Sequence, residues 1–210
     1  MNFSNLESVI FDLGGVLLNL DYHLTIEAFE GLGIKNAQYL FSQKSQNQIF
    51  DDFETGKISA MKFRNELRKL ISNPVTDQQI DDAWNAMLLD FPKNRFQFLE
   101  KVSKSYRIFL LSNTNEIHMH WFKSYVNARF GKNRFFDLFE VAYLSNEVGM
   151  RKPHLEIFDY VVQANGLNPK TTLFIDDSPQ HLVGAKQADL QVIWLEKGME
   201  TTKILSNLLH

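Results

Sequence analysis

The sequence contains no cysteine among its 210 residues, which excludes disulfides, thiolate metal sites and a cysteine nucleophile. It also has no uninterrupted apolar run of the roughly 18 residues that a membrane span needs. The N-terminal stretch, with Glu7 ahead of the first apolar run, lacks the basic-then-apolar pattern of a secretion signal. We therefore expect a cytoplasmic protein without membrane association, in which any metal is held by oxygen or imidazole.

Basic charge is sparse as well. The formal net charge is −3, and Lys and Arg form neither a block nor a basic helix face. Because a nucleic-acid-binding surface needs such a patch, we expect no nucleic-acid partner. The composition is otherwise that of a globular protein, with 44% hydrophobic residues. The length suits one core domain with a modest insertion.

Five short apolar runs, separated by segments of helical periodicity, are spaced along the chain. They cover residues 9–11, 108–111, 141–144, 173–175 and 192–195. Short runs without polar alternation are typical of strands covered on both faces of a parallel sheet. Helices are expected over 92–103, over 153–165 and from the Ser178-Pro179 cap onward. This alternation predicts an α/β fold with a doubly wound, Rossmann-like parallel sheet.

Residues 20–90 break the alternation, because they show helical periodicity and no convincing strand. Helices are expected over 22–32, 37–54, 59–71 and 77–89, the last opened by a capping box. We therefore expect a helical cap domain at 20–90, inserted into a catalytic core made of 1–19 and 91–210. The alternative is that these helices pack directly on the sheet. Their apolar residues would serve a small core or a dimer contact, so we expect a monomer or a weak homodimer.

Polar residues follow three of the predicted strands. Asp12 follows the first strand, Ser112 and Asn113 follow the second, and Asp176 with Asp177 follows the fourth. Ligands of open α/β sheets bind at the carboxyl ends of the strands, so we expect these side chains to share one crevice. Three carboxylates there would repel one another without a cation between them. Since the chain has no cysteine and no suitable set of histidines, Mg²⁺ is the natural cation.

Each cluster has a simpler interpretation when it is taken alone. Asp12 could cap a strand end, and the acidic pair at 176–177 could cap the helix that begins at Pro179. The turn at 112–113 could be purely local, although its hydroxyl and N–H groups can face a phosphate. Lys152, just before a helix opened by proline, could be solvated. Their expected convergence on one crevice favours a functional role.

Asp12, Ser112, Lys152 and the Asp176-Asp177 pair, in this order, resemble the four motifs of the haloacid dehalogenase-like superfamily. The resemblance covers nearly the whole chain, including a helical cap inserted after the first strand. The segments FDLGGVL, LLSNTN, GMRKPHLEIF and LFIDDS are similar to a branch of sugar-phosphate phosphatases that includes bacterial α-glucose-1-phosphate phosphatase. The FETGKIS stretch at 53–59 supports that branch.

The resemblance implies a magnesium-dependent phosphatase that acts on a small phosphorylated metabolite, with a sugar phosphate as the expected substrate. Asp12 would attack phosphorus and form an aspartyl-phosphate that water then hydrolyses. Mg²⁺ would be held by Asp12, the backbone carbonyl of Gly14 and Asp177, while Asp176 would either ligate it or act through water. The phosphate oxygens would be bound by Ser112, Asn113 and Lys152, a role that suits phosphoryl transfer, which depends on positioning and charge neutralisation.

Gly14 departs from the pattern of the superfamily, in which most phosphatases carry a second aspartate at this position as general acid and base. Such proton transfer is typically worth ~10²–10⁴-fold in rate. Asp21, His23 and Asn115 are the candidates for contacting the substrate or supplying the proton. Asp21 could equally cap the helix that begins at Tyr22. A substrate whose leaving group needs little protonation, such as an anomeric phosphate, is the other explanation.

The remaining histidines do not form a zinc site by their spacing. His118 and His120 lie two residues apart, which does not place them on one helix face, so we expect surface or packing roles. His154 and His181 lie beside the Lys152 and Asp177 motifs, where either could line the rim of the site.

Two rival functions stay open at this point. A metal-independent 2-haloacid dehalogenase would use the same nucleophile on carbon, but its fourth motif lacks the acidic pair at 176–177. A non-catalytic or regulatory member of the superfamily would explain Gly14, but not the other intact motifs. A phosphoryl-transferring mutase is disfavoured by the missing acid.

Overall fold

The computed structural model describes residues 5–40, 47–204 and 206. Five parallel strands form one sheet in the order β3-β2-β1-β4-β5. Their bounds are β1 Ser8–Phe11, β2 Arg107–Ser112, β3 Val141–Leu144, β4 Thr172–Asp176 and β5 Gln191–Trp194. β1 lies in the centre, where Ile10 pairs with Phe109 of β2 and with Phe174 of β4. The chain order reverses beside β1, which confirms the predicted doubly wound α/β fold and places a crevice at the carboxyl end of β1.

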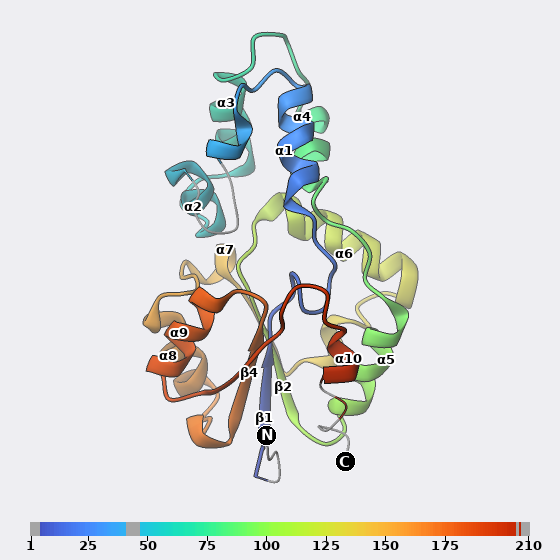
Figure 1. The fold of residues 1–210 in the computed structure, drawn as a ribbon, viewed down its shortest axis with the longest axis vertical. Helices are drawn as coiled ribbons and strands as arrows, with labels where there is room; N and C mark the ends of the chain where they lie inside the picture. The colour runs from blue at the N-terminus through green and yellow to red at the C-terminus, as the bar shows by residue number, and fades with distance from the viewer. Residues whose placement is uncertain (1–4, 41–46, 205, 207–210) are drawn as a thin grey trace.

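Helices cover both faces of the sheet (Figure 1). On one face lie α5 Lys93–Val102, α6 Glu116–Phe130 and α10 Thr201–Ile204, and on the other lie α8 Leu155–Ala164 and α9 Pro179–Gln187. Successive side chains of β1 serve opposite faces, as a strand requires. Val9 and Phe11 belong to the apolar cluster under α5 and α6, whereas Ile10 belongs to the cluster under α8 and α9. Short elements complete the core: α7 Ser145–Val148 and the 3-10 helices η2 Phe136–Leu138 and η3 Pro169–Thr171.

The helices of the insertion form a third apolar cluster beyond the carboxyl end of the sheet (Figure 1). They are α1 Tyr22–Gly31, η1 Ala37–Tyr39, α2 Gln48–Glu54, α3 Ala60–Arg68 and α4 Asp77–Asn85. Phe50, Phe63 and Trp84 pack ring against ring at the centre of the cluster. Of its fully buried members within the described chain, Ile117 of α6 alone comes from outside the insertion. The helices therefore pack mainly on one another, and their assignment as a cap domain with limits at 20 and 90 stays a prediction.

The chain enters and leaves the insertion through two adjacent segments. The N–H of Asn19 donates to the carbonyl of Asp90 at 2.9 Å, and the N–H of Leu89 donates to the carbonyl of Asn19 at 3.0 Å. Leu20 and Leu88 form an antiparallel bridge next to them. This pairing ends the last helix of the insertion at Asn85, a few residues before the predicted limit of 89.

The predicted helix over 37–54 is wrong as a continuous element. Its first part is the single 3-10 turn η1, and α2 begins only at Gln48 after the N-cap Asn47; residues 41–46 of the prediction lie outside the described residues. The helix caps were predicted better. Ser59 caps α3, and Thr76 with Gln79 forms the expected capping box of α4.

Candidate active site

Lys152 lies between two carboxylates at the carboxyl end of the sheet. Its Nζ is 2.8 Å from Oδ1 of Asp12, which directly follows β1, and 2.6 Å from Oδ2 of Asp176, the last residue of β4. Lys152 and Asp176 are fully buried, and Asp12 is 6% exposed. A buried charge is costly unless it is paired, so this arrangement is stable only as a unit. The structure thus brings together three of the residues predicted from the sequence.

The pKa values of the two acids in this unit are shifted in opposite directions. Burial, reinforced by Asp176, raises the pKa of Asp12 well above its usual value, although Lys152 opposes the shift. Burial acts on Asp176 in the same direction, but Lys152 and His181 outweigh it and hold the pKa of Asp176 below its usual value. Burial would also lower the pKa of Lys152, yet the two carboxylates raise it. One ammonium therefore faces two buried acids, an imbalance that favours a further cation.

The donor atoms around Lys152 fit such a cation. Asp12, Asp176 and His181 each offer one ligand atom, and these atoms lie within 4.8 Å of one another. Nδ1 of His181 is 3.0 Å from both carboxylate oxygens of Asp176, so the imidazole is held by that acid. The remaining donors are carboxylate oxygens, which are the ligands that Mg²⁺ prefers.

Asp177 approaches the same loop from β4. Gly15 has φ +73°, and a Cβ added there would collide with Oδ2 of Asp177. A glycine at position 15 therefore lets the Asp177 carboxylate lie against the turn that carries Asp12 and Gly14. Asp177 is not in the close group formed by Asp12, Asp176 and His181, and its predicted role as a metal ligand stays a prediction.

Ser112 and Asn113 lie at the end of β2, beside the carboxylates. Ser112 is buried, and its hydroxyl donates to the carbonyl of Asn113 at 3.4 Å. The side chain of Asn113 exchanges two hydrogen bonds of 2.9 Å with the backbone of Lys152. Asn113 therefore fixes the loop that presents Lys152, a contact that the sequence did not suggest because it links two distant segments.

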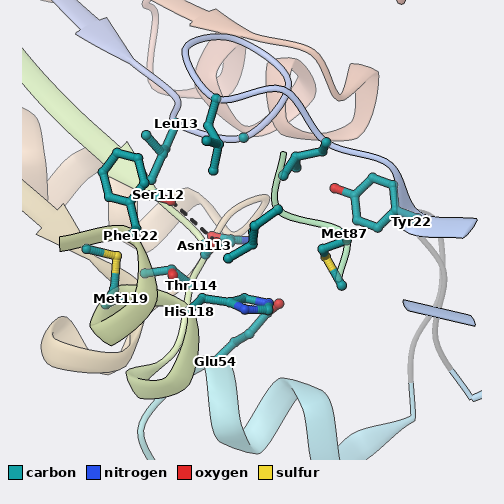
Figure 2. A pocket seen from close by; sticks show the side chains of 14 residues that line it. Leu13, Tyr22, Glu54, Met87, Ser112, Asn113, Thr114, His118, Met119 and Phe122 are labelled. Carbon is teal, nitrogen blue, oxygen red and sulfur yellow. Dashed lines mark hydrogen bonds between the residues drawn. The ribbon is translucent and has the colours of Figure 1, made fainter. Parts of the chain in front are cut away.

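A cavity with an empty volume of about 510 Å³, which includes part of its opening to solvent, adjoins Ser112 and Asn113 (Figure 2). Both the core and the insertion line it. Its walls are Leu13, Gly14, Leu18, Leu20, Tyr22, Glu54, Met87, Leu88, Ser112, Asn113, Thr114, His118, Met119 and Phe122. The mixture of apolar walls and a few polar groups is typical of a small-molecule site.

The structure does not bring the three predicted acid or substrate candidates into this cavity. Asp21 caps α1, and its carboxylate accepts the N–H of His23 at 3.0 Å; the His23 side chain is exposed. Asn115 caps α6, and its Oδ1 accepts from the N–H of His118 and from Nε1 of Trp84. The capping interpretation of Asp21 therefore describes what the structure shows, and Asn115 serves the same purpose.

The side chain of Leu20 lies directly beside Gly14. A Cβ at this position would lie 2.6 Å from Cδ1 of Leu20, so the side chain of Leu20 fills the volume next to it. The position that carries an acid in most phosphatases of the resembled superfamily is thus occupied by an apolar side chain from the segment leading into the insertion.

Three polar residues of the cavity were missed or underestimated in the sequence. His118, expected in a surface or packing role, stacks on Trp84 with ring centroids 4.6 Å apart. Glu54 reaches the cavity from the end of α2 and pairs with Arg151 at 2.9 Å. Tyr22 lies at the start of α1, where burial and nearby acids raise its pKa. The position of His118 in the first turn of α6, directly after the Ser112 cluster, was the one available signal.

The chain matches the model of the haloacid dehalogenase-like hydrolase over residues 6–189. The chain belongs to this hydrolase family. The predicted superfamily is confirmed, whereas the α-glucose-1-phosphate phosphatase branch stays a prediction.

Relatives of similar length agree with this assignment. The chain is 30% identical over 205 residues to a D-ribitol-5-phosphate phosphatase from Bacteroides thetaiotaomicron, covering 98% of this chain and 99% of that protein. A haloacid dehalogenase family enzyme of the same organism, solved as an aspartate-to-alanine variant with magnesium and inorganic phosphate, has a TM-score of 0.89 and 36% identity, covering 95% and 98% of the two chains. A related hydrolase from Porphyromonas gingivalis has a TM-score of 0.88 and 28% identity over 99% of both chains. None of the helices in the described ranges has the length and apolar character needed to cross a bilayer.

Proposed function

We propose that this hydrolase is a magnesium-dependent phosphatase that acts on a small phosphorylated metabolite, with a sugar or sugar-alcohol phosphate as the substrate class. The observation that carries the proposal is the buried Asp12–Lys152–Asp176 unit beside a cavity that also contains Ser112 and Asn113. Two relatives support it: one is named for a sugar-alcohol phosphate, and one was solved with magnesium and phosphate.

Asp12 is the nucleophile in this proposal. Its Oδ1 accepts hydrogen bonds from Lys152 at 2.8 Å and from the N–H of Leu13 at 2.7 Å, so we assign the attack on phosphorus to Oδ2. The new Oδ2–P bond forms while the bond between phosphorus and the ester oxygen breaks, and the ester oxygen keeps the electron pair of that bond, takes a proton from water and leaves as the alcohol. Water then attacks the phosphorus of the aspartyl-phosphate, which releases inorganic phosphate and restores the carboxylate.

Charge neutralisation comes from the groups around the phosphoryl position. Lys152, the hydroxyl of Ser112 and the backbone N–H of Asn113 would bind the non-bridging oxygens. Asp12, the carbonyl of Gly14 and Asp177 would hold Mg²⁺, which supplies positive charge to the same oxygens when bound.

Asp176 has a positioning role in this scheme. Its carboxylate already accepts hydrogen bonds from Lys152, from His181 and from the N–H of Ser178. With both oxygens engaged by the protein, we assign Asp176 to holding Lys152 and to contacting the metal through water.

The test is phosphate release from p-nitrophenyl phosphate and from D-ribitol 5-phosphate, with MgCl₂ and with EDTA. We expect release that requires magnesium and is lost in Asp12→Asn. Asp21→Asn is the matched control, because asparagine caps a helix as well as aspartate does, and its turnover should equal that of the wild type. Release that survives in Asp12→Asn would overturn the proposal, and chloride release from a 2-haloacid in EDTA would favour the dehalogenase instead.

A further inference from the structure

His118 is the most enclosed ionisable group that faces the cavity from the core side. It projects from the first turn of α6, immediately after the Ser112–Thr114 turn, and is 9% exposed. Figure 2 shows its ring between that turn and the side chain of Glu54. Trp84 stacks on the imidazole at an interplanar angle of 19°. The ring is therefore held in one orientation before any ligand arrives.

One hydrogen bond of the ring indicates its tautomer. Nδ1 lies 2.9 Å from Oδ1 of Asn85; with the Asn85 amide in this orientation Nδ1 donates the hydrogen bond, because an amide oxygen only accepts. Nε2 then holds a lone pair and acts as an acceptor. Burial lowers the pKa of His118 to about 3, so this neutral form persists at physiological pH. Within the described ranges of the chain, the structure gives Nε2 no hydrogen-bond partner.

His118 lines the cavity, so a ligand that fills the cavity would take Nε2 out of contact with water, and an acceptor left there without a partner is costly. A phosphate bound at Ser112 and Asn113 would extend its organic group into the same cavity, past His118. An alkyl chain would pack on Leu18 and Met87 and leave Nε2 unsatisfied, whereas a hydroxyl on that chain would donate to it. Glu54, whose side chain is drawn beside the His118 ring in Figure 2, also lines the cavity and adds a carboxylate acceptor.

We propose that Nε2 of His118 accepts a hydrogen bond from a substrate hydroxyl, which makes His118 a specificity-determining residue that selects polyol phosphates over alkyl phosphates. This inference rests on the proposed phosphatase function and adds that the cavity recognises a hydroxyl group of the substrate. The imidazole binds the leaving group as a neutral acceptor and carries no proton to it.

Two substitutions of His118 distinguish the contribution of Nδ1 from that of Nε2. In His118→Asn the amide occupies the place of Nδ1, keeps the contact with Asn85 and leaves nothing at Nε2. In His118→Gln the longer side chain brings an amide oxygen near the place of Nε2. His120→Gln, on the exposed side of the same helix, is the matched control.

The measured quantity is the ratio of kcat/KM for D-ribitol 5-phosphate to kcat/KM for n-pentyl phosphate, which lacks the hydroxyls. We expect the wild type and His120→Gln to favour the polyol. His118→Asn should lower the ratio by about 10- to 100-fold, the effect of losing one hydrogen bond in an enclosed site. His118→Gln should restore most of it.

An unchanged ratio in a folded His118→Asn variant, with melting temperature within a few degrees of the wild type, would overturn the inference while the phosphatase function stands. Equal loss in His118→Asn and His118→Gln would also overturn it, because the acceptor at Nε2 would then be irrelevant. If the wild type releases phosphate from neither ester nor from p-nitrophenyl phosphate, the proposed function itself fails. If His118→Asn does not fold, the comparison of His118→Gln with His118→Leu, which has no acceptor, gives the same decision.

Discussion

Replacing Lys152 by methionine removes the only cation that contacts both Asp12 and Asp176 among the described residues. Methionine fills most of the space of the lysine stem, so the cavity left behind is small and the effect is mainly electrostatic. Two buried carboxylates then face each other without their shared partner. Breaking a buried ion pair on one side typically costs about 3–5 kcal/mol, and we expect a loss of that size in the free energy of unfolding.

The assay is urea unfolding of both proteins in EDTA and again in millimolar MgCl₂. In EDTA the full loss should appear, and magnesium should reduce it, because a cation that binds the folded state stabilises that state. Lys170→Met is the matched control: Lys170 pairs with Asp189 at 3.0 Å, but the two side chains are 70% and 71% exposed. Such a surface pair is worth about 0–1 kcal/mol. If Lys152→Met costs no more than Lys170→Met, the buried pair does not hold the site together.

Three further predictions concern the insertion and its boundary with the core. Gly56→Ala should cost about 1–3 kcal/mol more than Gly33→Ala in urea unfolding, because both glycines have positive φ but only at Gly56 would a Cβ collide, with the carbonyl of Asn146. Arg151→Met removes the ion pairs to α2, and should raise KM and speed amide exchange in α2. His118→Gln should flatten the pH dependence of stability: the folded pKa of about 3 lies below the ordinary 6.5, so the wild type loses up to ~1.4 kcal/mol per pH unit as pH falls below 6.5.

Each of these has a contradicting result. Equal losses in Gly56→Ala and Gly33→Ala would mean that the insertion does not rest on Asn146. Unchanged KM and unchanged exchange of α2 in Arg151→Met would show that its ion pairs do not hold the insertion in place. Parallel stability curves for the wild type and His118→Gln between pH 4 and 6.5 would show that the imidazole is not buried in its neutral form.

The sheet could be predicted because each strand is a short apolar run bounded by polar residues. The run from Val9 to Phe11 is apolar throughout, so it could be predicted as a strand buried on both faces without knowledge of the tertiary structure. The doubly wound fold was predicted from the alternation of such runs with helices. The positions of Asp12 and Asp176 at strand ends placed them at one edge of the sheet. The superfamily followed from the order of these motifs, and the comparison with known families confirmed it.

The contacts that define the cavity could not be read in the same way. Lys152, which contacts Asp12 and Asp176, lies in a loop whose backbone is hydrogen-bonded to the side chain of Asn113, a residue of a distant segment. The role of His118 was predicted from its spacing to His120, two residues later in the chain. Its hydrogen-bond partner, Asn85, comes from another helix, 33 residues earlier. Long-range packing of this kind leaves no period in the sequence. The start of α2 at Gln48, after its cap Asn47, was likewise not predicted.

The central claim is that Asp12 itself becomes phosphorylated. The most direct measurement is mass spectrometry of peptides from a reaction with D-ribitol 5-phosphate and MgCl₂, quenched in acid within the first turnover. The account predicts a transient mass increase of one phosphoryl group on the peptide that contains Asp12, which disappears as phosphate is released and is absent in Asp12→Asn. Phosphate release with the wild type at full rate, without that species at any time during the first turnover, would contradict the account.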